Sequence, residues 1–164
     1  MKFTAAINTT LLVICLLASP VVLAYKRGIS LDFNWKFHLG DVSGAQARGF
    51  NDQDWRILDL PHDFSIEGEY DKNNPAGWSG GYLPTGIGWY RKHLSVPQKW
   101  QGKRLILRFD GVYLNSDVWV NGQHVGHRPN GYVSFSYDIT PYLQGPYGGA
   151  TLKALILLCE LIIA

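Results

Sequence analysis

The sequence has few cysteines, little net charge and no convincing helical periodicity between Tyr25 and Pro146. Of its two cysteines, Cys15 falls in an export-type leader and only Cys159 remains, which excludes an internal disulfide framework. A formal net charge of +2 gives no electrostatic reason to expect a nucleic acid or an anionic membrane surface as partner. The 164 residues suffice for one domain but not for a barrel enzyme of ordinary size.

Residues that common catalytic sites require are scarce as well. The only glutamates are Glu67, Glu69 and Glu160, and nothing around the first two separates their pKa values as an acid–base pair needs. His124 and His127 lack a third metal ligand at a suitable spacing and are interpreted as surface residues. No glycine-rich phosphate loop or Ser-His-Asp order is found. We therefore expect no catalytic residue, no metal and no cofactor in this chain.

The first 24 residues have the pattern of a signal peptide. Lys2 precedes an apolar run from Leu11 to Leu17, and Val22 and Ala24 provide small residues before a cleavage site. Pro20 interrupts the apolar segment, which is too short to span a bilayer. The pattern predicts cleavage before Tyr25, export to the periplasm or the medium, and no membrane association afterwards.

The remaining chain shows the alternation of short β-strands. Leu105, Leu107 and Phe109 share one face of a predicted strand, and Val118 and Val120 share one face of the next. Strands are expected at 33–38, 55–60, 88–96, 104–110, 116–120, 123–126 and 132–137. The dipeptide 121–122, Asn-Gly, predicts a type I′ hairpin turn. This pattern predicts an all-β fold, an antiparallel β-sandwich or jelly roll.

A long segment from Pro61 to Gly86 interrupts the strand pattern, and loops of this length in a sandwich are usually functional. It combines aromatic side chains with amides and a carboxylate, the groups that bind saccharides through C–H faces and hydroxyls. The candidate substrate-binding residues are Asp71, Asn73, Asn74 and Trp78. The alternative is that Trp78 and Tyr82 fold back onto the sandwich as a small local core.

Several ordered motifs resemble one protein family. They are LPHDFSIEG at 60–68, NNPAG at 73–77, GGYLPTGIGWYRK at 80–92, FDGVY at 109–113, DVWVNGQHVG at 117–126 and DITPYL at 138–143. The first is similar to the LPHDW-x-IEG motif of glycoside hydrolase family two, which contains β-galactosidases and β-glucuronidases. The resemblance covers roughly residues 29–143 and is nearest to exported bacterial β-galactosidase-like members.

This resemblance implies that residues 25–143 form the family's sugar-binding jelly roll, a galactose-binding-like domain. In the family an immunoglobulin-like domain and a (β/α)₈ barrel with both catalytic glutamates follow it, and this chain resembles neither. The expected role is an accessory domain of a hydrolase that acts on a β-linked saccharide. The resemblance implies that this chain is a fragment of such a hydrolase without the catalytic barrel and is inactive in isolation. A free-standing carbohydrate-binding module and a purely structural sandwich are the alternatives.

Residues 144–164 depart from the family pattern. The family's closing strand ends in Val-Asp-Asn, whereas this tail is apolar between Thr151 and Ile163, with Lys153 and Glu160 as its charges. The difference suggests a truncated or frame-shifted product. If residues 152–158 form the closing strand, Leu152, Ala154, Ile156 and Leu158 face the core; a short helix is the alternative. In both cases we expect a marginally stable, aggregation-prone domain.

Overall fold

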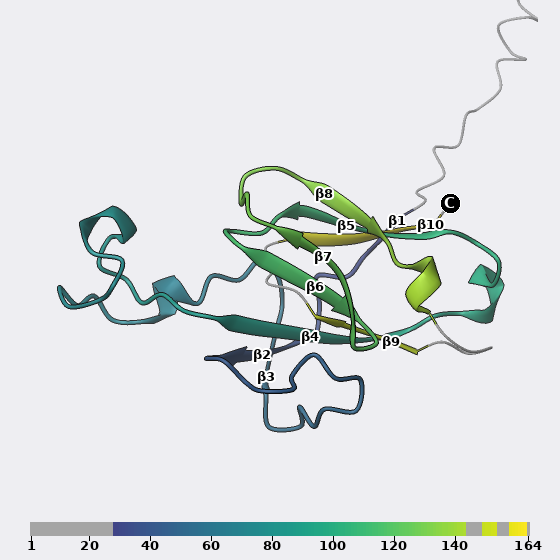
Figure 1. Ribbon diagram of the computed structural model, residues 1–164, viewed down its shortest axis with the longest axis horizontal. Coiled ribbons are helices and arrows are strands. Elements are labelled where there is room, and N and C mark those ends of the chain that lie inside the picture. Colours follow the sequence, from purple (N-terminus) through teal and green to yellow (C-terminus); the bar gives the residue numbers. More distant parts are fainter. Residues whose placement is uncertain (1–27, 144–148, 154–157, 164) are drawn as a thin grey trace, which may run out of the picture.

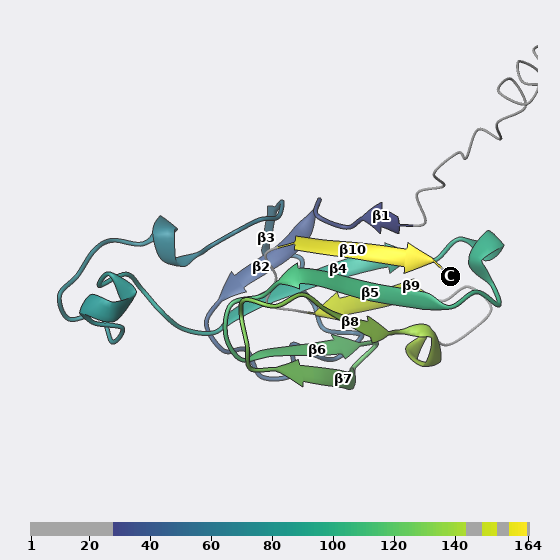
Figure 2. The same cartoon turned by 90° about the horizontal axis from the view of Figure 1, so that it is seen from above.

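The computed structural model describes residues 28–143 and the backbone of two further strands, at 149–153 and 158–163. Two sheets with antiparallel pairing pack face to face, and a long arm projects from one end of the sandwich (Figure 1). Figure 2 shows the same two layers from above, with β5 and β10 lying over β4 and β9. The predicted β-sandwich is confirmed. The predicted signal segment, 1–24, lies outside the described residues.

The strands divide between the sheets as follows. One sheet contains, in spatial order, β1 (Gly28–Ser30), β10 (Leu158–Ile163), β5 (Leu105–Gly111) and β8 (Phe135–Asp138). The other contains β3 (Arg56–Leu58), β2 (Trp35–Leu39), β4 (Gly88–Ser95), β9 (Gly149–Lys153), β6 (Ser116–Val120) and β7 (Gln123–Arg128). Short 3₁₀ helices lie in the connections: η1 (Ser65–Glu67), η2 (Trp78–Gly80), η3 (Gln98–Trp100) and η4 (Thr140–Tyr142).

The alternation in the sequence places the apolar face of each central strand between the sheets. Leu105, Leu107 and Phe109 of β5 are buried, as are Val118 and Val120 of β6, so both predicted faces are confirmed. The main core contains Leu31, Trp35, Phe37, Leu60, Tyr90, Leu105, Leu107, Phe109, Val112, Val118, Val120 and Ile139. The β6–β7 turn also forms as predicted, because Asn121 and Gly122 both have positive φ angles, 53° and 84°.

A second, smaller core lies on the outer face of β4. There the 40–55 segment packs its apolar side chains, Val42, Ala45, Phe50 and Trp55, against Trp89. Arg91, two residues further along the same face, is completely buried and donates hydrogen bonds to Asp52 and to the carbonyl of Ala45. This segment therefore covers a sheet face that the strand pattern alone leaves open to water.

Two predicted strands begin at least two residues later than expected. Asn34 adopts a left-handed conformation (φ 59°), which ends the extended path from Phe33 and moves the start of β2 to Trp35. The strand predicted at 132–137 begins only at Phe135. The Tyr132 amide donates to the Asn130 side chain at 2.8 Å, so a local turn takes the amide that a strand ladder would use.

The backbone of the tail differs from the single closing strand expected at 152–158. Residues 149–153 form β9 between β4 and β6, whereas residues 158–163 form β10 between β1 and β5. Residues 152 and 153 thus belong to a strand in one sheet and residue 158 to a strand in the other, so 152–158 is not a single closing strand, and the tail supplies an interior strand to each sheet. The helix alternative falls on residues 154–157, outside the described residues. Ala154 and Ile156 lie outside the described residues, and the predicted tendency to aggregate stays a prediction.

Candidate functional site

The most prominent functional candidate is the arm, residues 68–86, which extends beyond the sandwich (Figure 1). Its root follows β3 and consists of the segment from Pro61 to Glu67, which ends in η1. Two backbone hydrogen bonds join parts of the arm to each other. The Asp71 amide donates to the Tyr82 carbonyl, and the Tyr82 amide donates to the Gly77 carbonyl. The long loop expected from the sequence is therefore an ordered, self-contacting extension.

Polar side chains hold the arm at its root. The Arg56 guanidinium donates to both oxygens of Glu67, at 3.0 and 2.7 Å, and His62 Nε2 lies 3.1 Å from Glu67 Oε1. The other ring nitrogen of His62 contacts the hydroxyl of Tyr90 at 2.7 Å. The hydrogen bond from Arg56 holds the pKa of Glu67 below its ordinary value. Burial raises the pKa of Tyr90, so its phenol stays protonated.

Three of the predicted binding residues lie in the first half of the arm. Asp71 Oδ1 accepts hydrogen bonds from the backbone amide and the side-chain amide of Asn73, at 2.8 and 2.9 Å. Asn74 Nδ2 donates to the Tyr82 carbonyl at 2.7 Å and so joins the two limbs of the arm. Asp71 and Asn73 therefore form one exposed polar pair, whereas Asn74 shapes the arm.

Trp78 opens η2 and is 82% exposed. The alternative in which this indole folds back onto the sandwich is therefore wrong. Tyr82 instead packs against Tyr70 of the same arm, with ring centroids 5.3 Å apart. An exposed indole beside amides and a carboxylate has the group types that saccharides bind.

A groove of about 600 Å³ lies between the arm and the loops at the end of the sandwich from which the arm projects. Its lining residues are His62, Asp63, Phe64, Ser65, Gly80, Leu83, Pro84, Thr85, Gly86, Tyr90, Val112, Tyr113, Leu114 and Tyr132. Tyr113 and Tyr132 meet edge to face at 5.8 Å, and the contact with Tyr132 raises the pKa of Tyr113. This volume is within the range of small-molecule sites.

None of Asp71, Asn73, Asn74 and Trp78 lines this groove. The structure places them further out on the arm, so the candidate site has an outer polar part and an inner aromatic part. Sequence reasoning missed Tyr113 and Tyr132 as site residues. No local pattern in the sequence signals this pair, because the fold brings the two connections together so closely that a Cβ on Gly131 would lie 2.8 Å from the Tyr113 Cα.

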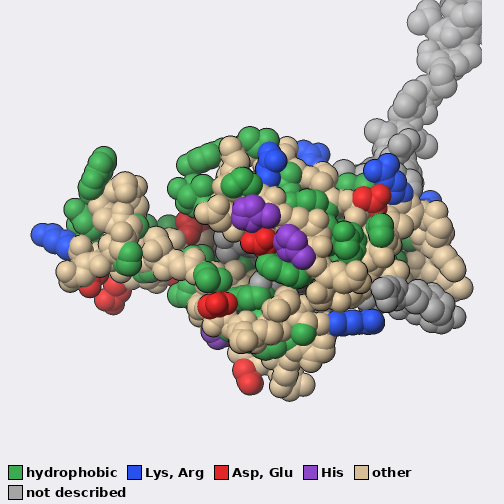
Figure 3. All heavy atoms as spheres, in the orientation of Figure 1, with side chains coloured by type: hydrophobic (Ala, Val, Ile, Leu, Met, Phe, Trp, Pro, Cys, Tyr) green, Lys and Arg blue, Asp and Glu red, His purple; other side chains and the backbone are tan. Residues whose placement is uncertain are grey.

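Histidines and acidic groups gather on the face over β6 and β7 (Figure 3). Asp117 contacts His124 at 2.8 Å and His127 at 3.2 Å. Burial raises the pKa of Asp117, but the hydrogen bonds from both histidines outweigh it and leave the pKa lowered. Within the described part of the chain, no group of three His, Cys, Asp or Glu side chains has a geometry that holds a metal.

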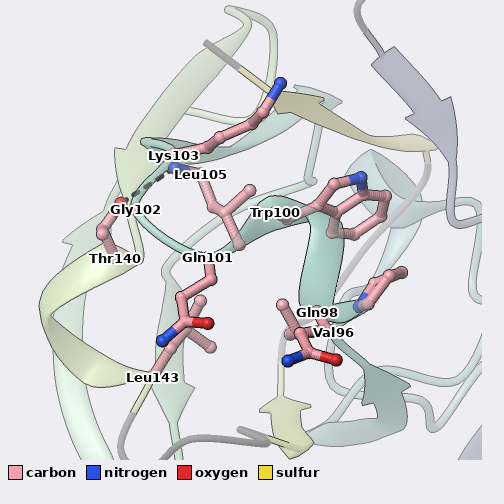
Figure 4. Close-up of a pocket in the computed structure, with 10 residues that line it drawn as sticks. Val96, Gln98, Trp100, Gln101, Gly102, Lys103, Leu105, Thr140 and Leu143 are labelled. Carbon is pink, nitrogen blue, oxygen red and sulfur yellow. Dashed lines mark hydrogen bonds between the residues drawn. The ribbon is translucent and has the colours of Figure 1, made fainter.

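A smaller pocket of about 130 Å³ lies between η3 and η4 (Figure 4). The side chains of Gln98 and Gln101 approach it from opposite sides, and Thr140 Oγ1 accepts a hydrogen bond from the Leu105 amide at 2.8 Å. This volume is below the range of about 300–1,000 Å³ that is typical of small-molecule sites. The groove beside the arm is therefore the more suitable place for a ligand of sugar size.

Similarity to known proteins agrees with this arrangement. Residues 29–157 match the sequence profile of the glycosyl hydrolases family 2 sugar binding domain. A β-galactosidase of Bacteroides ovatus is 57% identical over 115 residues, and a putative β-glucuronidase of Formosa agariphila is 42% identical over 135 residues. These matches cover 69% and 79% of this chain but only 14% and 13% of those proteins.

The fold is similar to solved structures as well. A crystal structure of a β-glycosidase from Bacteroides vulgatus is 43% identical with a TM-score of 0.77, and the match covers 84% of this chain and 20% of that one. In the described part of the chain, no helix has the length and apolar character needed to cross a membrane. From the profile match and these relatives, the chain belongs to glycosyl hydrolases family 2, as its sugar-binding domain.

Proposed function

We propose that this chain acts as the N-terminal sugar-binding domain of an exported β-galactosidase-like hydrolase, in which a catalytic barrel supplies the glycosidic chemistry. The observation that carries the proposal is the 57% identity to a β-galactosidase over 115 residues. The signal-peptide pattern of residues 1–24 supports export, and N-terminal sequencing of the secreted protein should find Tyr25 first.

Within this function, we assign the saccharide contact to the arm. Asp71 and Asn73 offer a carboxylate and amides, which suit hydroxyl groups, and Trp78 offers an exposed aromatic face for sugar C–H groups. The arm carries these groups away from the sandwich, where another domain of the hydrolase can meet them (Figure 1). The arm therefore lies at the rim of the proposed active site.

The isolated chain should hydrolyse no nitrophenyl β-galactoside or β-glucuronide above the buffer background. Retaining and inverting glycosidases need two facing carboxyl groups whose pKa values differ. In the described residues Glu67 is engaged by Arg56, and the neighbouring Glu69 lies exposed on the same segment. Turnover that disappeared in the Glu67→Gln variant would contradict this expectation.

The arm's role can be measured in a chimera in which residues 28–143 replace the matching segment of the Bacteroides ovatus enzyme. Asn73→Ala should raise KM about 5–10-fold, the effect of losing one hydrogen bond to the sugar, and change kcat less. Asn74→Ala should also raise KM, because it removes the hydrogen bond to the Tyr82 carbonyl that shapes the arm. The matched control is Asn51→Ala, an exposed asparagine in a similar local turn on the 40–55 segment. Unchanged KM for both arm variants would mean that the arm only supports the fold.

Direct binding separates the two alternatives that do not involve catalysis. A free-standing carbohydrate-binding module should bind a β-linked oligosaccharide as an isolated chain, measurably by calorimetry. A purely structural sandwich should bind none, and its arm variants should behave as the parent does. The proposed accessory role instead predicts that Asn73→Ala weakens sugar binding more in the chimera, where the barrel is present, than in the isolated chain.

A further inference from the structure

The arm meets the sandwich through one concentrated set of polar contacts, which we call the root clamp: Arg56, His62 and Glu67. Arg56 belongs to β3, whereas Glu67 lies in η1 at the start of the arm. The two N–O distances of 2.7 and 3.0 Å show a charge-assisted contact to both carboxylate oxygens. Glu67 therefore connects the arm to a strand of the sheet.

The clamp stands on buried aromatic side chains of the sandwich. The His62 ring packs on Phe37 of β2 at 4.7 Å and contacts Tyr90 of β4, and both partners are buried. The Arg56 guanidinium lies over the same Phe37 ring, 5.2 Å from its centroid. Because strands β2 and β4 are paired in the sheet, these contacts hold the clamp on a rigid part of the molecule.

Beyond the clamp the two limbs of the arm are joined to each other. A Cβ on Gly68 would lie 2.3 Å from Pro84 Cγ, which shows how closely the limbs approach just above the root. Further out, Asn74 Nδ2 donates to the Tyr82 carbonyl. The arm can therefore move as one unit, and its direction depends mainly on the root.

We propose that Glu67 is a positioning residue, which sets the direction of the arm through Arg56 and His62 and so presents Asp71, Asn73 and Trp78 to the saccharide. The part of this proposal that concerns sugar binding rests on the proposed function. The part that concerns the direction of the arm is independent of that function. It also gives a reason for three polar side chains at the root, where no substrate contact is assigned.

The first experiment measures the direction of the arm in the signal-free chain. Spin labels are attached at Ser79→Cys on the arm and Ser134→Cys on the sandwich, and Cys159→Ser removes the native cysteine. Pulsed electron paramagnetic resonance then gives the distribution of distances between the two labels. Glu67→Gln should broaden this distribution, whereas Glu69→Gln should leave it unchanged. Glu69 is the matched control, because it lies two residues away, is exposed and has no ion pair among the described contacts.

The second experiment measures KM in the chimera described above. Glu67→Gln should raise KM about 5–10-fold with a smaller change in kcat. Arg56→Lys should give an intermediate rise, because it keeps the positive charge near Glu67 but loses the planar guanidinium that lies over Phe37. The melting temperature of Glu67→Gln should stay close to that of Glu69→Gln, since both partners of the pair are partly exposed.

The outcomes distinguish the proposal from the function on which it rests. An unchanged distance distribution in Glu67→Gln would show that the clamp does not direct the arm and would overturn the proposal. A broadened distribution with unchanged KM, while Asn73→Ala still raises KM, would overturn positioning and leave the proposed function standing. Unchanged KM in Asn73→Ala as well would remove the proposed sugar contact itself.

Discussion

Replacing Arg91 by methionine should lower the free energy of unfolding by about 3–5 kcal/mol, the cost of removing one partner from a buried ion pair. Arg91 is completely buried on the outer face of β4, and its Nε donates to Asp52 Oδ2 at 2.9 Å. Its Nη1 also donates to the carbonyls of Ala45 and Ala47. The variant leaves Asp52 with His93 alone and removes the hydrogen bonds from Arg91 to the 40–55 segment, whose apolar contacts with Trp89 remain.

Urea denaturation followed by tryptophan fluorescence measures this effect. The matched control is Arg108→Met, the same substitution in the exposed pair with Asp110, which should cost less than about 1 kcal/mol. A second substitution, Asp52→Leu, added to Arg91→Met should recover part of the loss, because it removes the unpaired carboxylate. If Arg91→Met and Arg108→Met lowered the free energy of unfolding equally, burial of the Arg91–Asp52 pair would add nothing to stability.

The sequence predicts the sandwich well wherever alternation and turn chemistry are local properties. The apolar faces of β5 and β6 follow from a period of two, and the Asn121–Gly122 turn follows from its need for positive φ angles. Arg91 shows the limit of this reasoning. Alternation places it opposite the buried Tyr90, facing outward, but only the fold brings the 40–55 segment across that face to bury it.

The candidate site also has one part that the sequence predicts and one that it does not. The arm could be predicted as a long loop that carries candidate binding groups, because its length and composition are visible in the chain. The exposure of Trp78 could not, because the sequence is equally compatible with an indole that folds back onto the sandwich. The groove could not, because Tyr113 and Tyr132 belong to separate connections that only the packing of the sheets brings together. Tyr132 was also expected in a strand, and a local turn through Asn130 removes it from the ladder.

Replacing Phe109 by alanine should lower the free energy of unfolding by about 3–5 kcal/mol. Phe109 is fully buried on β5, stacks on Phe135 at 4.8 Å and meets Tyr137 at 6.4 Å. Its loss removes apolar burial and leaves a cavity between the sheets at the point where β5 pairs with β8. A domain with an ordinary stability of about 5–15 kcal/mol would lose a large share of it.

The size series Phe109→Leu and Phe109→Ala separates cavity formation from a general defect in folding. The leucine variant should lose clearly less than the alanine variant, since it retains most of the buried volume. Phe33→Ala is the control on an exposed phenylalanine, which is 59% accessible to solvent and should change stability by less than about 0.5 kcal/mol. If Phe109→Ala cost no more than Phe33→Ala, the side chains of β5 would not form the core that holds the two sheets together. The root clamp contacts strands β2, β3 and β4 of the sheet that does not contain β5. A Phe109 variant that remains folded should therefore leave the spin-label distance distribution of the arm unchanged.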